Sequence, residues 1–157
     1  MRKTALMLAT VIGAATLPAL AMASPMQEAR AHLHAIAKAD VPAIMADYAP
    51  NAVFQWVGGP LDGNYEGTPA IQSVWRKFTH ANGPIHVKID DMEVAANPKG
   101  ATVTADVIFK GAKPIPVRYV MTFRQGVLVN EIWQIDPKLM HEMKEMHEEN
   151  GSGYSGS

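Results

Sequence analysis

Apolar residues recur every three or four positions in the first half of the chain, which is typical of helices that pack one face on a core. Thr68-Pro69 is a strong helix start, because a threonine hydroxyl caps the first turn and proline fits the first helical position. A shorter helix begins after Asp40 and is limited by Pro50. The predicted elements are helices over 25–39, 41–48 and 68–80, a strand over 52–57 and a loop over 58–64.

After the last of these helices the period of the apolar residues changes from 3.6 to 2, which is typical of half-buried strands. The phase slips once, so we expect a β-bulge near Asp90-Asp91. Arg124-Gln125-Gly126 suits a three-residue hairpin loop with glycine in the left-handed position. The predicted strands cover 85–94, 103–109, 117–123 and 127–135, followed by a helix over 137–149 and a flexible tail over 150–157.

This order of elements contains no βαβ alternation. Helices gathered on one face of an antiparallel sheet make an α+β domain, which we place over 24–136. The 157 residues include no cysteine, which excludes a disulfide scaffold, a thiolate metal site and a cysteine nucleophile. The formal net charge of −1 argues against a nucleic-acid-binding protein, which needs a basic face. No HExxH pattern occurs, and we expect neither a catalytic metal nor a cofactor.

The first 23 residues have the composition of a cleaved secretory signal. Arg2 and Lys3 precede a largely apolar stretch over 5–20, and Ala21-Met22-Ala23 is a small-x-small cleavage pattern. A membrane anchor is the alternative, but the uninterrupted apolar stretch is short for a span of about 20 residues. Without the two basic residues of this segment the chain keeps 12 Lys+Arg against 15 Asp+Glu. We therefore expect a mildly acidic, periplasmic or secreted protein that leaves the membrane after cleavage.

Three segments, in this order and spacing, resemble the SnoaL-like branch of the nuclear transport factor 2-like (NTF2-like) superfamily over roughly 32–136. They are ADV with MADYAPNAV between Ala39 and Val53, YEGTPAI from Tyr65, and FRQG with EIW, which begin at Phe123 and Glu131. The resemblance implies a cone, in which a curved antiparallel sheet wraps around the long helix and leaves a pocket at one end. It also implies that the chain dimerises through the sheet, as many members do. The fold hosts isomerases, cyclases, dehydratases, hydrolases and non-catalytic domains, so it does not assign a function.

Ketosteroid isomerases of this fold use a tyrosine and a protonated aspartic acid as an oxyanion hole, and an aspartate as the base. The resemblance places these three positions on His32, Tyr119 and Trp56 respectively. His32 and Tyr119 keep a hydrogen-bond donor, but the indole N–H of Trp56 cannot accept a proton. The isomerase mechanism is therefore disfavoured.

Glu131 is the one charged residue in the apolar series of the last strand. With a three-residue hairpin loop, Tyr119 pairs with Glu131 and Val117 with Trp133, all facing the concave side of the sheet. Desolvation would raise the pKa of Glu131 and suit it to general acid or base chemistry near neutral pH. The neighbouring residues offer no cation, so we expect Glu131→Gln to be neutral or stabilising. Alternatively, Glu131 simply accepts the Tyr119 hydroxyl.

The leading hypothesis is an exported, cofactor-free protein that binds a small, mostly apolar organic molecule in the cone. Any chemistry would be of the acid–base type used by isomerases, cyclases or hydrolases, with Glu131, Tyr119 and His32 as candidate catalytic residues. The candidate ligand-binding residues are Val117, Met121, Trp56 and Trp133.

Two alternatives stay open. One is a non-catalytic, dimeric interaction domain whose cone is plugged by Trp56, Trp75 and Trp133; an open pocket containing Glu131 would favour the ligand binder instead. The other is copper binding by the last helix, where Met140, Met143 and His147 share one face. An adaptable apolar stripe of the same helix, packing on the domain, explains the methionines equally well.

Overall fold

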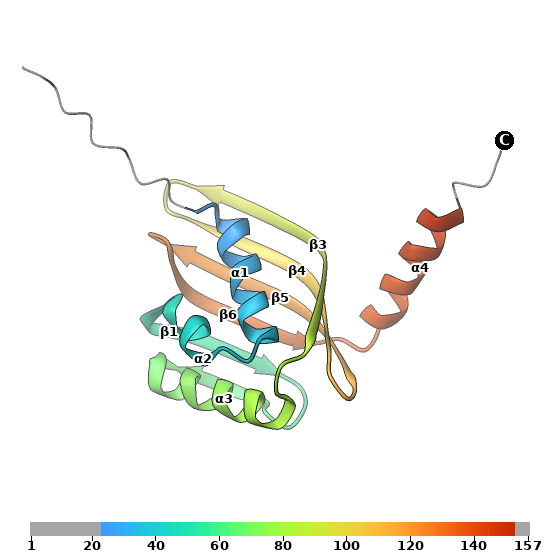
Figure 1. Cartoon of the computed structure of the whole chain (residues 1–157). Coiled ribbons are helices and arrows are strands. Elements are labelled where there is room, and N and C mark those ends of the chain that lie inside the picture. Colours follow the sequence, from blue (N-terminus) through green and yellow to red (C-terminus); the bar gives the residue numbers. More distant parts are fainter. Residues whose placement is uncertain (1–22, 153–157) are drawn as a thin grey trace, which may run out of the picture.

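The computed structural model describes residues 23–152, which form four helices and one six-stranded sheet (Figure 1). The helices are α1 (Pro25–Ala37), α2 (Val41–Ala46), α3 (Gly67–Asn82) and α4 (Leu139–Ser152). The strands are β1 (Tyr48–Val57), β2 (Gly63–Glu66), β3 (His86–Asn97), β4 (Gly100–Lys110), β5 (Pro114–Arg124) and β6 (Val127–Ile135). The expected signal segment, apart from Ala23, and the end of the expected tail lie outside the described residues. No helix within residues 23–152 has the length and apolar character needed to cross a membrane.

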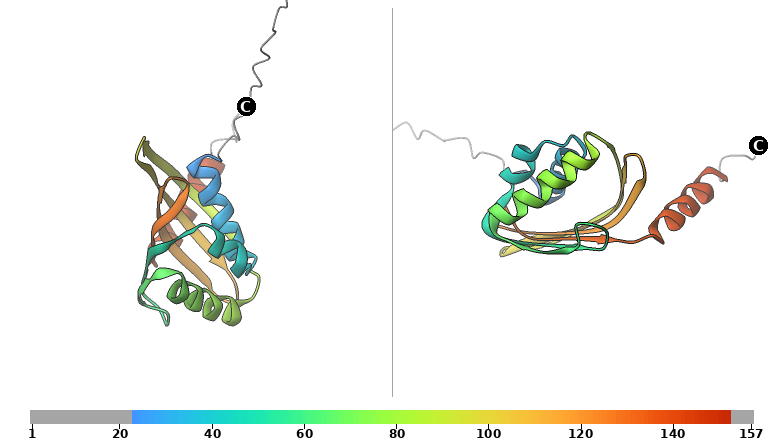
Figure 2. Two further views of the ribbon diagram at one scale, coloured as in Figure 1. Left: turned by 90° about the vertical axis from the view of Figure 1, so that its left-hand side faces the viewer. Right: turned by 90° about the horizontal axis from the view of Figure 1, so that it is seen from below.

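The sheet has the strand order β2-β1-β6-β5-β4-β3 and curves around the first three helices. Figure 2 shows α1, α2 and α3 on its concave side and α4 beyond its far end. The expected α+β cone is therefore present, but the sheet is mixed, because β1 pairs with β6 in parallel. The long crossover through α3 and three strands returns β6 beside β1 running in the same direction, as parallel pairing requires.

At two places the type of element differs from the sequence-based expectation. Tyr48 opens β1 instead of closing α2, because it pairs with Leu128 while the Leu128 N–H donates to the Asp47 carbonyl. The expected loop over 58–64 contains the start of β2, where Gly63 pairs with Trp56. In both places pairing with another strand decides the conformation: Tyr48 pairs with the distant strand β6, and Gly63 pairs with β1, the strand that precedes it.

The expected bulge in β3 is confirmed, since the β3–β4 register shifts between Asp90 and Glu93. The expected β5–β6 register is wrong. Arg124 pairs with Val127 across a two-residue turn, whose residues Gln125 and Gly126 have φ angles of 52° and 75°.

A second irregularity, between Thr122 and Phe123, then shifts the β5–β6 register by one residue. Tyr119 consequently pairs with Trp133, and Met121 pairs with Glu131. The expected pairs are each displaced by two residues. Because the displacement is even, Tyr119, Glu131 and Trp133 still share the concave side.

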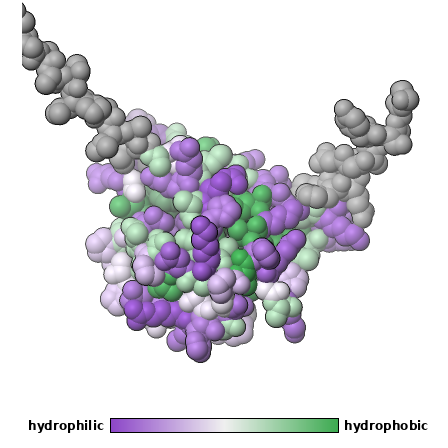
Figure 3. Space-filling model, viewed as in Figure 1, coloured by the Kyte–Doolittle hydropathy of each residue, from purple (hydrophilic) through white to green (hydrophobic). Residues whose placement is uncertain are grey.

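The main core lies between the concave side of the sheet and α1, α2 and α3. A small separate core lies on the convex side, where Leu139 and Met143 of α4 pack against Ile108 of β4. Figure 3 shows apolar surface between α1 and the base of α4, over the curled edge of the sheet. The edge strand β3 carries the partly buried residues Val87, Ile89 and Met92.

Candidate functional site

His32 and Glu131 are the two fully buried polar side chains in the described part of the chain, each with 0% of its surface exposed. His32 lies on α1, whose start is set by a capping box between Ser24 and Gln27. That start puts His32 on the inward face with Ala29, Leu33 and Ile36. Glu131 lies on the concave side of β6. The packing of α1 on the sheet therefore places the His32 imidazole next to the Glu131 carboxyl group.

Glu131 accepts hydrogen bonds from three side chains. His32 Nε2 lies 3.1 Å from Glu131 Oε1, and the Tyr119 hydroxyl donates to the same oxygen. The Tyr48 hydroxyl donates to Oε2, and it accepts in turn from Trp75 Nε1 at 2.8 Å. Both carboxyl oxygens thus have partners within the chain.

The other nitrogen of His32, Nδ1, lies 3.0 Å from Asp47 Oδ2. The Asp47 side chain is 36% exposed, so the chain of contacts runs from solvent through His32 to the buried carboxyl group. We call His32, Asp47, Tyr48, Tyr119 and Glu131 the Glu131 cluster.

Charge and burial act against each other in this cluster. Burial alone would lower the pKa of His32, but the charge of Glu131 and the hydrogen bonds to Asp47 and Glu131 raise it to about 9. Burial raises the pKa of Glu131, and the neighbouring His32 opposes that shift. At neutral pH His32 is therefore an imidazolium that donates from both nitrogens. The upward shift expected for the pKa of Glu131 is present, although α1 supplies a cation that the flanking strand residues Val129, Trp133 and Ile135 do not offer.

Three tryptophans fill the space beside the Glu131 cluster. The rings of Trp56 and Trp133 stack with centroids 4.3 Å apart, and Trp75 lies 5.7 Å from the first and 5.9 Å from the second. All three are buried, with exposures of 4% or less. The indole N–H groups of Trp56 and Trp133 have no hydrogen-bond partner among the described residues.

Three described hollows in the molecular surface lie away from this cluster. One lies between the β3–β4 turn and β5, and two lie against the exposed side of α3. None of these three is lined by Glu131, His32 or Tyr119. The carboxyl group thus lies inside a packed core rather than on the wall of one of these hollows.

The structure brings together the three candidate catalytic residues named from the sequence. The four candidate ligand-binding residues, Val117, Met121, Trp56 and Trp133, are buried on the same concave side. Sequence reasoning missed Asp47, Tyr48 and the bond from Trp75. Asp47 and Tyr48 lie inside the quoted MADYAPNAV segment, but the helix predicted there gave Tyr48 the wrong phase.

Of the α4 methionines whose side chains are described, Met143 is engaged in packing and Met140 is exposed. Met143 is 1% exposed and contacts Leu139 and Ile108, so its thioether is not free to bind copper. His147 lies among the residues whose side chains are not described. On α1, His32 is buried and His34 is exposed, so these two imidazoles do not converge. No group of three or more His, Asp or Glu side chains in the described chain is placed to hold a metal ion.

Solved structures with the same architecture come from several bacteria. An NTF2-like protein of unknown function from Pseudomonas putida KT2440 is 20% identical, with a TM-score of 0.61 over 69% of this chain and 81% of that one. A ketosteroid isomerase-like protein from Erwinia carotovora atroseptica SCRI1043 is 18% identical, with a TM-score of 0.55 over 69% and 91%. At these identities the likeness shows the fold alone.

No curated protein sequence matches the chain. A family model does: residues 29–127 match the SnoaL-like domain, a match that covers more than half of the 157 residues and includes most of α1, all of α3 and most of the sheet. Together with the curved sheet and its helices, this match shows that the chain belongs to the SnoaL-like domain family.

Proposed function

We propose that this protein is a non-catalytic SnoaL-like domain that acts as a homodimer, with the filled cone serving as its structural core. The observation that carries the proposal is the state of Glu131. The side chain is fully buried, and both of its oxygens accept hydrogen bonds from His32, Tyr48 and Tyr119. A general acid or base must reach a substrate proton within hydrogen-bond distance. Glu131 is fully buried, so a substrate could reach it only if the packed core around it opened.

The tryptophans support the same proposal. Trp56, Trp75 and Trp133 pack against one another and against Phe78, which lies 5.4 Å from Trp56 and 5.3 Å from Trp133 between ring centroids. Phe109 stacks on Trp133 at 4.9 Å. Displacing such rings to admit a ligand would forfeit several kcal/mol of packing, since removal of one buried aromatic side chain costs about 3–5 kcal/mol.

The convex side of the sheet offers the interface. Antiparallel strands that face water usually carry polar residues on that side. Here Val120 of β5 pairs with Ile132 of β6, and Val53 of β1 lies in the neighbouring row; all three are partly exposed. A second copy of the chain that covers this apolar patch would bury it symmetrically.

Sedimentation velocity of the purified protein tests the dimer. We expect a dimer for the parent and a monomer for Ile132→Glu. In a symmetric interface the two introduced carboxylates would be buried close to each other, and they would repel. Ser73→Glu places the same charge on the exposed side of α3 and should leave the dimer intact. A monomeric parent, or an Ile132→Glu dimer of unchanged affinity, would overturn the proposed assembly.

One observation favours a second candidate, a small apolar molecule bound in the cone and acted on by the Glu131 cluster. The indole N–H groups of Trp56 and Trp133 are buried without partners, and each such group costs about 1–3 kcal/mol. A carbonyl or ether oxygen of a ligand would satisfy one or both. Mass spectrometry of the intact protein under native conditions separates the two candidates: a stoichiometric small molecule supports the ligand binder, and its absence supports the filled cone.

The location of the protein is part of the proposal. The basic and apolar composition of the first 23 residues supports export to the periplasm or the medium, with the mature chain beginning near Ser24. Ser24 is also the residue that caps α1.

A further inference from the structure

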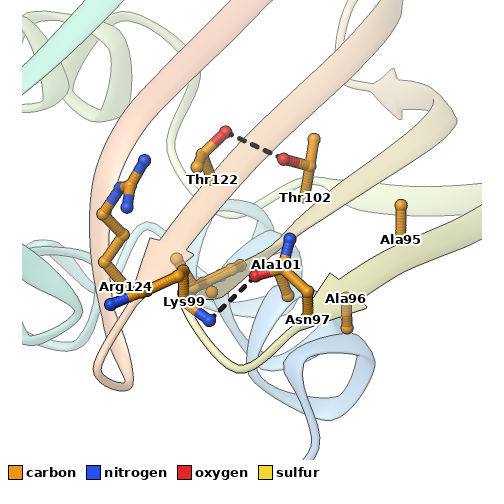
Figure 4. A pocket seen from close by; sticks show the side chains of 10 residues that line it. Ala95, Ala96, Asn97, Lys99, Ala101, Thr102, Thr122 and Arg124 are labelled. Carbon is orange, nitrogen blue, oxygen red and sulfur yellow. Dashed lines mark hydrogen bonds between the residues drawn. The ribbon is translucent and has the colours of Figure 1, made fainter.

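A hollow of about 270 Å³ lies on the convex side of the sheet, at the end opposite α4 (Figure 4). Small residues on two neighbouring rows of the sheet, Gly100 and Ala95, are among those that line it. Gly100 lies between Asn97 of β3 and Arg124 of β5, and a Cβ atom on Gly100 would overlap the carbonyl oxygen of Phe123. In the next row Ala95 pairs with Thr102, which pairs with Thr122. The sheet itself therefore forms the floor of the hollow.

The groups around this hollow are positively charged or can donate hydrogen bonds. Lys99 and Arg124 lie at its rim, and none of the residues that line it is acidic. Neither cation forms an ion pair with another residue of the described chain, whereas Arg118 on the same side of the sheet contacts three carboxylates. Two cations thus face an open hollow without compensation, in a chain whose net charge is negative.

Thr102 and Thr122 add a hydroxyl group that can donate a hydrogen bond to a ligand. The hydroxyls of Thr102 and Thr122 are 3.3 Å apart and point toward each other in Figure 4. A hydroxyl has one proton, so when one of the pair donates to the other, the second keeps its proton for an outside acceptor. Arg124 lies two residues after Thr122 on the same side of β5, and its side chain extends back along the strand toward Thr122 (Figure 4).

We propose that this hollow, bounded by Lys99, Arg124 and the Thr102–Thr122 pair, binds a small molecule through an oxyanion group of the carboxylate or phosphate class. The guanidinium provides a planar fork of N–H donors that matches two oxygens of such a group. The threonine hydroxyl that keeps its proton donates a third hydrogen bond to the oxyanion, and Lys99 adds positive charge. The volume is close to the lower end of ligand sites in proteins, about 300 Å³, so it accepts one small group rather than a large molecule. This site is separate from the cone and lies on the convex side of the sheet, one row along from Val120 of the proposed dimer interface.

Amide chemical-shift titration of the full protein with inorganic phosphate tests the site, with sodium acetate and sodium chloride as parallel arms at equal ionic strength. We expect saturable shifts at Gly100, Thr102, Thr122 and Arg124 with phosphate or acetate, and the stronger of the two identifies the oxyanion class. Equal shifts with chloride would show ionic screening alone and would overturn the proposal.

Variants separate charge from shape. Arg124→Gln should weaken binding about tenfold, because a charge-assisted hydrogen bond is lost. Lys77→Gln removes the same charge on α3 and should leave binding unchanged. Ala95→Phe keeps the charge but fills the hollow, and it should abolish the shifts. All three positions are exposed, so the spectra also report whether each variant is folded. Undiminished binding in both Arg124→Gln and Ala95→Phe would contradict the assignment.

Discussion

Tyr119 donates a hydrogen bond to Glu131 although the two residues are not partners across the strands. Tyr119 pairs with Trp133, and Glu131 pairs with Met121, so the bond runs diagonally over two positions on the concave side. Diagonal neighbours of this kind lie within reach of long side chains. The buried carboxyl group is thus surrounded by hydrogen-bond donors from His32, Tyr48 and Tyr119. These hydrogen bonds determine how the stability of the protein responds to mutation and to pH.

Replacing Glu131 by Gln should destabilise the protein at pH 7 by about 1–3 kcal/mol. The amide keeps one acceptor, but its NH₂ group would face the hydroxyl of Tyr48, and His32 would lose its charged partner. This replaces the sequence-based expectation of a neutral or stabilising change, which assumed no neighbouring cation. Chemical unfolding of the variant beside Glu93→Gln, an exposed carboxylate on β3, measures the difference; equal stabilities of both variants would count against a structural role.

The stability of the fold should fall as the pH rises above about 6.5. The pKa of His32 is raised from 6.5 to about 9 in the folded chain, so its stabilising contribution is complete below 6.5 and is lost as the pH rises through 9. Melting curves between pH 6 and pH 10, in steps of roughly one unit, would record this loss. His32→Gln should flatten the profile over this range, while His34→Gln, exposed on the same helix, should keep it. A variant at His32 that retains the full decline would assign the effect to another group.

The two tyrosines that bind Glu131 should differ in importance. Tyr48→Phe removes the donor to Oε2 and also the acceptor for Trp75 Nε1, whereas Tyr119→Phe leaves His32 bonded to Oε1. Each buried group left without a partner costs about 1–3 kcal/mol, so Tyr48→Phe should be the more destabilising variant. Urea unfolding of both variants gives the comparison. The reverse order would mean that the bond between Trp75 and Tyr48 contributes little.

Arg118 should control how firmly α4 is held on the convex side. Its guanidinium contacts Asp106 of β4, Asp136 after β6 and Glu142 of α4. The cluster is partly exposed, so Arg118→Gln should cost no more than about 1 kcal/mol of global stability, but it should speed amide exchange in α4. High salt should do the same to the parent. Arg76→Gln, which loses an exposed cation on α3, serves as the control. If amide exchange in α4 is unchanged in the Arg118 variant, the apolar contacts of Leu139 and Met143 alone hold this helix on the sheet.

Export should remove the first 23 residues. We expect N-terminal sequencing of the protein from the culture or periplasm to begin at Ser24, since Ala21-Met22-Ala23 follows the apolar stretch. Ala23→Arg should block this cleavage, because the position before the cut accepts small residues. A product of the parent that begins at Met1 would contradict the prediction.

Local sequence patterns were enough to predict the types of most elements and the family. Periods of 3.6 and 2 distinguish helix from strand because each period places apolar side chains on one face of its element. The same local patterns placed His32, Trp56, Trp75, Trp133 and Glu131 toward the interior. The SnoaL-like resemblance rested on segments whose order does not depend on knowing any long-range contact.

The remaining features depend on how strands and helices pair and pack. The β5–β6 register follows from a two-residue turn and a bulge next to it, between Thr122 and Phe123, and neither is apparent from the alternation of apolar residues. The strand at Tyr48 forms because β6 is there to pair with it. The cation beside Glu131 comes from His32, which lies 99 positions earlier in the sequence. Packing of the three tryptophans closes the cone, since the sequence specifies their presence but the folded arrangement determines whether their rings line a space or fill it.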